Sequence, residues 1–276
     1  MDALFTSAMT LREIHAAGDD PVYEGELNEH WTIGPKVHGG AMVALCGHAA
    51  RTAYGNDVLQ PVAVSANFLR APDPGPMRLV TSIRKQGRRI SVVDVELTQD
   101  DRAAVHAVVT LGQPEHWHAP LLSAHPVVDL MAPEPPDDVA PIGPGHPLAG
   151  LVHLGAGCDI RPLLSTLGPV ADAAGGKPPV IQMWARPRDV APDALFALLC
   201  GDLSAPVTFA VDRTGWAPTV QLTALLRGLP ADGWLRVMCT CTEIGQEWFD
   251  EDHTVVDSAG RLVLQSRQLA LVPPPR

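Results

Sequence analysis

Residues 37–54 read VHGGAMVALCGHAARTAY. Small and apolar residues recur at helical spacing in this stretch, at Ala41, Ala44, Leu45 and Ala49. The following Gly55-Asn56-Asp57 is a stop signal. We therefore predict a turn at residues 37–40 and one helix from Ala41 to Tyr54.

Strand-like segments follow this helix at Pro61–Arg70, Met77–Gln86, Ser91–Thr98 and Ala103–Leu111. Pro72-Asp73-Pro74-Gly75-Pro76 separates the first two and cannot form a central strand. One helix followed by a run of antiparallel strands predicts an α+β fold rather than an alternating βαβ fold.

The second half of the chain repeats this order. Pro192-Asp193 starts a helix that we predict to run through Leu203 and to stop before Pro206. Strand-like segments then lie at Thr219–Arg227, Trp234–Glu243, Glu247–Val256 and Leu262–Val272. Leu45-Cys46-Gly47 recurs as Leu199-Cys200-Gly201, and further identities keep the same order, which indicates a tandem duplication.

Prolines are concentrated between Gln113 and Gly150, in a chain that has 27 of them. This composition is typical of an extended connector. We therefore predict a first repeat at residues 1–112, a linker at 113–155 and a second repeat at 156–276.

The composition excludes several classes of partner. The chain has 276 residues, 46% of them hydrophobic and 18% charged, with a net charge of −11. An acidic chain does not favour nucleic acid or a polybasic grip on a membrane. There is no signal-peptide h-region near the N-terminus and no membrane-spanning apolar stretch, and the five cysteines are expected to be reduced. We expect a cytoplasmic protein.

A helix wrapped by a curved antiparallel sheet, present twice in one chain, resembles the double hotdog architecture. The order of elements is similar to that of the acyl-CoA thioesterase II family and its actinobacterial thioesterase-like relatives. The resemblance implies hydrolysis of a fatty acyl-CoA thioester to free acid and CoA, with no metal or organic cofactor.

In that family an Asp on the second helix, a Thr near the start of the next strand and a Gln on the last strand hold the attacking water. The resemblance places these roles on Asp202, Thr219 and Gln268. The sequence departs from the family at Gln221-Leu222-Thr223, which replaces a more usual acidic and histidine pair.

The first repeat has His48, Val62 and Val109 at the positions that correspond to these three residues. The polar set is therefore absent from the first repeat, which predicts one competent site per chain. His48 itself is interpreted as a core or interface histidine rather than a catalytic one.

The position of Asp202 fits a catalytic role or a local structural one. The residue shares a helix face with Leu195, Leu198 and Leu199. Burial and the negative end of the helix dipole should both raise the pKa of its carboxyl toward that of a useful general base. The alternative is a local capping role at the helix end.

Strand periodicity places Gln268 and Thr219 on different kinds of strand face. Gln268 shares a face with Leu262 and Leu264, whereas Thr219 shares the more polar face with Gln221 and Thr223. Periodicity therefore leaves open whether Thr219 meets Asp202. The alternative for both is a hydrogen-bonded strand residue without a catalytic role.

We expect two groups to bind substrate. The backbone N–H groups at Gly39 and Gly40 can polarise a carbonyl at a helix N-terminus, although a turn with positive φ would also require glycine. Arg84, Arg88 and Arg89 form a basic cluster that could contact CoA phosphates, the alternative being an exposed hairpin.

Other polar and aromatic groups are weaker candidates. His116-Trp117-His118 lacks further metal ligands nearby, and Asp250-Glu251-Asp252 is interpreted as a solvated turn, so we expect no metal site. Trp216 and Trp234 could line an acyl tunnel, with core packing as the alternative.

The sequence leaves two functional alternatives to thioester hydrolysis. One is a catalytically silent protein that binds acyl-CoA or lipid on the same fold. The other is an acyl-CoA hydratase, which would need a compact Asp and His motif that the sequence lacks. Exposed sheet faces and edges also lead us to expect a homo-oligomer.

Overall fold

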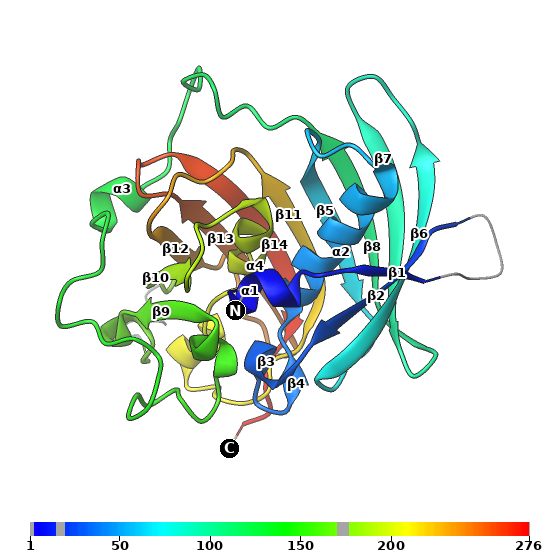
Figure 1. Ribbon diagram of the computed structural model, residues 1–276. Helices are drawn as coiled ribbons and strands as arrows, with labels where there is room; N and C mark the ends of the chain where they lie inside the picture. Colours follow the sequence, from blue (N-terminus) through cyan, green and yellow to red (C-terminus); the bar gives the residue numbers. More distant parts are fainter. Residues whose placement is uncertain (1–2, 15–19, 170–176, 276) are drawn as a thin grey trace.

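The computed structural model describes residues 3–14, 20–169 and 177–275. In each half of the molecule a central helix is wrapped by antiparallel strands, which is the predicted α+β double hotdog arrangement (Figure 1). The first half comprises β2 (Val22–Leu27), α2 (Gly39–Tyr54), β5 (Gln60–Phe68), β6 (Gly75–Lys85), β7 (Ser91–Gln99) and β8 (Arg102–Gly112). The second comprises β10 (Ile181–Pro187), α4 (Ala194–Cys200), β11 (Thr219–Leu226), β12 (Leu235–Thr240), β13 (Trp248–Val256) and β14 (Leu262–Leu271).

Within the described residues these strands form one sheet in the order β1-β2-β6-β7-β8-β5-β11-β14-β13-β12-β10-β9. The short strands β1 (Arg12–Ile14) and β9 (Cys158–Pro162) form its two edges. The halves join where β5 pairs with β11, with Ser65 opposite Thr223. The two orders mirror each other about this pair, as expected for a duplication.

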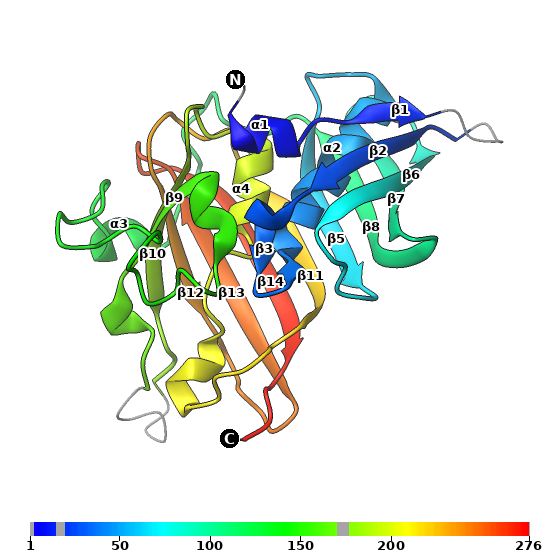
Figure 2. The same cartoon turned by 60° about the horizontal axis from the view of Figure 1, so that its bottom comes forward.

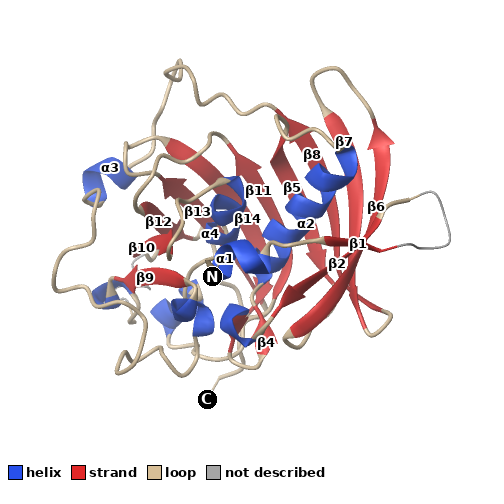
Figure 3. Cartoon of the chain, viewed as in Figure 1, coloured by secondary structure: helices blue, strands red, loops and turns tan. Residues whose placement is uncertain are grey.

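The other elements are short: α1 (Leu4–Ala8), β3 (Thr32–Ile33), β4 (Lys36–Val37) and α3 (Val127–Leu130). Figure 2 shows α1 above the central helices, and Figure 3 shows how far strands outweigh helices. In the part of the chain that the structure describes, no helix has the length and apolar character needed to span a membrane.

All eight predicted strands are present, with ends shifted by three residues or fewer. The first helix begins earlier than predicted, at Gly39, because His38 is its N-cap and accepts the backbone N–H of Ala41 on Nδ1 at 3.3 Å. Gly39 and Gly40 are helical and do not have positive φ. A turn with positive φ is therefore not why these positions are glycine.

The second helix ends at Cys200 and not at Leu203 as predicted. The N–H groups of Gly201, Asp202 and Leu203 bond to the carbonyls three residues back, at 3.1, 3.2 and 3.3 Å, so the α-helical ladder tightens into a turn. The carbonyl of Asp202 accepts a hydrogen bond from His38 Nε2 at 3.0 Å. Asp202 therefore lies in the turn after α4 and not in the helix's last turn.

The proline-rich segment between β8 and β9 packs on the second half rather than bridging open space. Val127 and Met131 are buried against Trp184 and Trp234. The Trp184 indole N–H also donates to the carbonyl of Ala132 at 2.8 Å. The segment is thus part of a second, smaller core, and the domain boundaries proposed above stay a prediction.

Candidate functional site

A cavity of about 890 Å³ lies where the N-terminus of α2 meets the end of α4 and the inner face of the second repeat's strands. Both repeats contribute to its wall. Its apolar wall includes Met42, Phe68, Phe209, Trp216 and Leu271, and its polar groups include His38, Asp202, Thr219, Glu251 and Gln268. The cavity has the character of a pocket for an apolar ligand with a polar reacting end.

The Asp202 side chain is 9% exposed and faces the first turn of α2. Burial raises the pKa of its carboxyl, while His38 and a hydrogen bond from the backbone N–H of Gly40 act in the opposite direction. His38 Nε2 lies 3.8 Å from Asp202 Oδ2. Since His38 Nδ1 accepts the Ala41 N–H, the neutral ring carries its proton on Nε2, toward Asp202.

The two glycines at the start of α2 permit this approach. A Cβ at position 39 would lie 2.5 Å from Asp202 Oδ2, and one at position 40 would lie 2.4 Å from the carbonyl oxygen of Leu199. Any larger residue would push α2 away from the end of α4. The close approach of two helices therefore explains both glycines.

Thr219 reaches the cavity because β11 has a bulge. Thr219 pairs with Ala270, but Gln221 pairs with Leu269, so Val220 is an extra residue. The bulge reverses the alternation and places Thr219 on the inner side with Leu222, although its sequence parity is that of Gln221. This answers the question that periodicity left open about its direction.

Gln268 lies on the buried inner face of β14, as predicted, and is 5% exposed. Thr219 Oγ1 donates to Gln268 Oε1 at 2.9 Å, and Gln268 Nε2 donates to Glu251 Oε2. The second oxygen of Glu251 accepts the backbone N–H of Val207 at 2.7 Å. A chain of hydrogen bonds thus runs from the cavity wall into the core.

Glu251 overturns one prediction. The Asp250-Glu251-Asp252 run is not a solvated turn: it lies inside β13, and Glu251 is 2% exposed. Burial raises the pKa of Glu251 to about 8, against the lowering effect of the Val207 N–H and Gln268; Asp202 raises it further. Its parity with Phe249 and His253 was the sequence signal that could have shown its inward direction.

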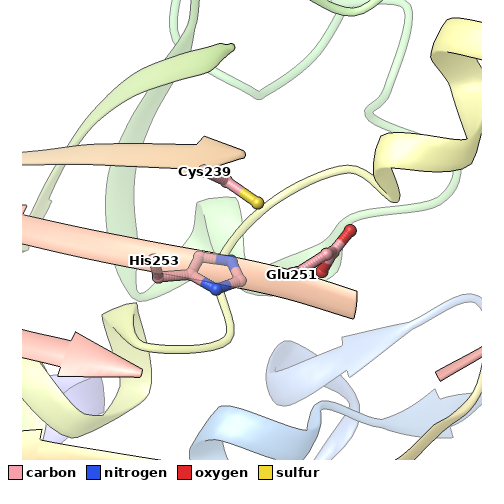
Figure 4. A group of neighbouring side chains, drawn as sticks. All are labelled: Cys239, Glu251 and His253. Carbon is pink, nitrogen blue, oxygen red and sulfur yellow. The ribbon is translucent and has the colours of Figure 1, made fainter. Parts of the chain in front are cut away.

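Cys239, Glu251 and His253 are the group that could hold a metal ion among the described residues, with ligand atoms within 4.8 Å of one another (Figure 4). His253 and Glu251 come from one strand and Cys239 from its neighbour. His253 Nε2 contacts Ser204 Oγ at 3.0 Å, and both Glu251 oxygens already accept N–H donors. Glu251 is therefore satisfied within the protein, whereas His253 Nδ1 is buried without a hydrogen-bond partner.

The structure does not bring the three arginines to the cavity. Arg84 pairs with Asp94 near the end of β6, and none of the three arginines is among the residues that line the cavity. Arg88 and Arg89 lie in the turn that follows. Of the two tryptophans, Trp216 lines the cavity and Trp234 packs with Trp184.

Comparison with known proteins agrees with this architecture. Residues 27–112 match the model of the acyl-CoA thioesterase N-terminal domain, and residues 132–272 match that of the C-terminal domain. An uncharacterized protein of Mycobacterium tuberculosis (strain H37Rv) is 73% identical, with 99% of each chain covered.

Solved structures give the same picture. A Thermobifida fusca protein proposed to be a thioesterase II has a TM-score of 0.81 at 26% identity, covering 99% of this chain and 98% of that one. Acyl-CoA thioesterase II TesB2 of Mycobacterium marinum has a TM-score of 0.70 at 17% identity, covering 98% and 97%.

The sheet order and the structural neighbours place the chain in the double hotdog class. More narrowly, the chain belongs to the acyl-CoA thioesterase family. Membership supports acyl-CoA thioesterase activity in general terms.

Proposed function

We propose that the protein hydrolyses a fatty acyl-CoA to the free acid and CoA by activating water at Asp202, Thr219 and Gln268. The observation that carries this proposal is the almost buried Asp202 carboxylate on the wall of an apolar cavity that also holds the Thr219–Gln268 pair. A raised pKa makes the ionised carboxylate a stronger base.

The proposed roles follow from the hydrogen bonds. Thr219 has committed its proton to Gln268, so its oxygen can accept one from a water molecule. Asp202 takes the other proton as the water oxygen bonds to the thioester carbonyl carbon. The positive end of α2 at Gly39 faces the same cavity and would stabilise the oxygen that becomes negative.

Breakdown of the tetrahedral intermediate completes the reaction and releases both products. The carbon–sulfur bond breaks, CoA leaves as a thiolate, and the proton held by Asp202 neutralises it. A thioester lacks the resonance of an amide, so water and carbonyl polarisation suffice without a covalent nucleophile. The apolar wall supplied by Met42, Phe68 and Phe209 would hold the acyl chain.

The test is release of free thiol from acyl-CoAs of increasing chain length. We expect turnover by the wild type and a loss of about 10²- to 10⁴-fold in kcat for Asp202→Asn. The matched control is Asp193→Asn, which changes the same group at the N-cap of α4, where Asn caps equally well. This control should leave kcat unchanged.

Two results would contradict the proposal. One is tight binding of acyl-CoA without thiol release at any chain length, which would indicate a silent binding protein. The other is an Asp202→Asn variant that is folded and as active as the wild type. Hydration of an enoyl-CoA, measured as the loss of its absorbance, would indicate the hydratase.

A further inference from the structure

We propose that Glu251 is a positioning residue that fixes the direction of the hydrogen bonds from Gln268 through Thr219 to the attacking water. The inference rests on the proposed function and goes beyond the three residues that the family resemblance supplied. Glu251 Oε2 accepts from Gln268 Nε2, and its Cα pairs with that of Gln268 across β13 and β14.

The direction follows from donor and acceptor chemistry. A Gln side chain is ambiguous by itself, because its amide can turn over and exchange oxygen for nitrogen. Glu251 offers an acceptor, so the amide nitrogen of Gln268 faces it and the amide oxygen faces Thr219. The Thr219 hydroxyl must then donate to that oxygen, which leaves only lone pairs for the water.

The hydrogen-bonded chain ends at a backbone group on the side away from the cavity. Val207 N–H donates to Glu251 Oε1 at 2.7 Å, so the carboxyl group is held on both oxygens. The ionised carboxylate accepts an N–H donor on each oxygen, and this fixes the direction. While Glu251 is a carboxylate, the hydrogen bonds therefore present Thr219 to the cavity as an acceptor.

Reversal of this direction has a chemical consequence. If the Gln268 amide turned over, its nitrogen would donate to Thr219 and the hydroxyl proton would be free to point at the water. The water would then accept from Thr219, and its own protons would lose one of their two fixed acceptors. Attack would slow although the cavity and Asp202 are unchanged.

The experiment is an exchange of the two side chains. In Glu251→Gln the new amide keeps its oxygen on Val207 N–H and directs an NH₂ group at Gln268, which favours turnover of the Gln268 amide. We expect kcat to fall about 10- to 100-fold with KM within about two-fold. Gln268→Glu places a third carboxylate beside Asp202 and Glu251, and kcat should also fall.

The double variant Glu251→Gln/Gln268→Glu restores the original direction. The amide introduced at position 251 donates to the carboxylate introduced at position 268, and Thr219 again donates to that carboxylate. We expect kcat of the double variant to be at least ten-fold higher than that of the less active single variant. The thermal midpoint should rise in the same way. A role in packing alone predicts that the two losses add.

The controls separate two kinds of failure. If the wild type turns over and Asp202→Asn does not, but the double variant is no better than the singles, the positioning role is wrong and the proposed function stands. If neither the wild type nor any variant releases thiol, the proposed function has failed, and the thermal-midpoint cycle alone reports the hydrogen-bond direction.

Because Cys239, Glu251 and His253 could bind a cation, every protein is assayed after dialysis against EDTA with and without added Zn²⁺. Dependence of the wild-type rate on Zn²⁺ would overturn the positioning role in favour of a metal.

Discussion

The two ends of the paired helices α2 and α4 have the same backbone plan but different side chains. At one end, Asp202 follows α4 and faces Gly39 at the start of α2. At the other, His48 of α2 occupies the position that Asp202 has in the second repeat, and Asp193 begins α4. The cavity opens at the first end, and neither His48 nor Asp193 is among its lining residues.

The helix N-termini explain much of this difference. Each N-terminus is capped by the side chain before it: His38 accepts the N–H of Ala41 at 3.3 Å, and Asp193 accepts the N–H of Phe196 at 2.8 Å. The difference is that Gly39, after His38, lines the cavity, and the N–H of Gly40 donates to Asp202 of the other repeat. His48 meets Arg51 at 3.1 Å, and burial, followed by Arg51, lowers the pKa of His48 to about 4. At this end of the helix pair, His48 and Asp193 both have hydrogen-bond partners within the protein.

The strands differ in the same way. Gln268 pairs with Leu222 and Glu251, whereas Val109 pairs with Val64 and Val93 at the equivalent places. Both central strands carry a bulge, at Val220 and at Val62, so the residue equivalent to Thr219 is Pro61 and not Val62. Duplication therefore supplied the geometry twice, and the polar groups exist in one copy.

Within this comparison the largest effect is expected from crowding the first turn of α2 against the end of α4. A methyl group at position 40 would meet the backbone oxygen of Leu199 at 2.4 Å and the Cβ of Asp202 at 3.1 Å, so neither neighbour can move away cheaply. We expect Gly40→Ala to lower kcat by about 10²-fold or more and to cost about 1–3 kcal/mol of stability. Thiol-release kinetics and thermal unfolding measure the two effects.

Gly47→Ala is the matched control in the same helix. Its Cβ would meet the flexible end of Leu198 at 3.0 Å, far from the cavity lining. Stability should change modestly and kcat should stay near that of the wild type. Equal losses of kcat in the two variants would show that the packing of α2 in general, and not the contact of its first turn with Asp202, limits the reaction.

A smaller effect is expected from Thr219→Val, which removes one hydroxyl at nearly constant shape. Loss of the acceptor for the water should lower kcat about 10- to 100-fold, or ~1.4–2.7 kcal/mol, with little change in KM. The control is Thr223→Val on the same strand, whose hydroxyl bonds Gln221 at 2.9 Å beside the junction of the repeats. A Thr219→Val variant as active as Thr223→Val would remove Thr219 from the proposed site.

The sequence was sufficient for the duplication, the α+β class and the inward direction of Gln268, because each depends on local periodicity and turn residues. It was not sufficient for Thr219, whose direction depends on the bulge at Val220. Nor did it show the short α4, since the change to three-residue hydrogen bonds after Cys200 is not visible in the residue pattern. Strands β9 and β10 were also missed, in a segment whose prolines and glycines dominate the pattern.

Glu251 was missed for a different reason. Three consecutive acidic residues are usually solvated, and only the alternation of Phe249, Glu251 and His253 along β13 turns the middle one inward. Composition also marks the arginine cluster as a basic patch but cannot place it relative to the cavity, whose lining does not include the three arginines; their contact with CoA phosphates stays a prediction.

The smallest expected effect concerns Glu251 and its uncharged counterpart Val93. Burial raises the pKa of Glu251 to about 8, from an ordinary value of 4.5. Between these values the folded protein holds a proton that the unfolded chain has lost, so unfolding releases a proton and the free energy of unfolding falls as pH rises. The contribution of one such group is at most about 1.4 kcal/mol per pH unit. His253, whose pKa burial lowers to about 4, is largely neutral in both states above pH 7 and adds little there.

Denaturant unfolding of the wild type and Glu251→Gln at pH 7 and pH 8 isolates this contribution. Groups that do not interact with Glu251 titrate alike in the two proteins, so the difference between their slopes reports residue 251 and the buried groups coupled to it. We expect the wild type to lose more stability over this interval than the variant. Parallel slopes would mean that Glu251 is already ionised at pH 7, held as a carboxylate by Val207 and Gln268. That result would leave the direction of the hydrogen bonds intact but would place two negative charges beside the attacking water, and Asp202 would then be the stronger base for it.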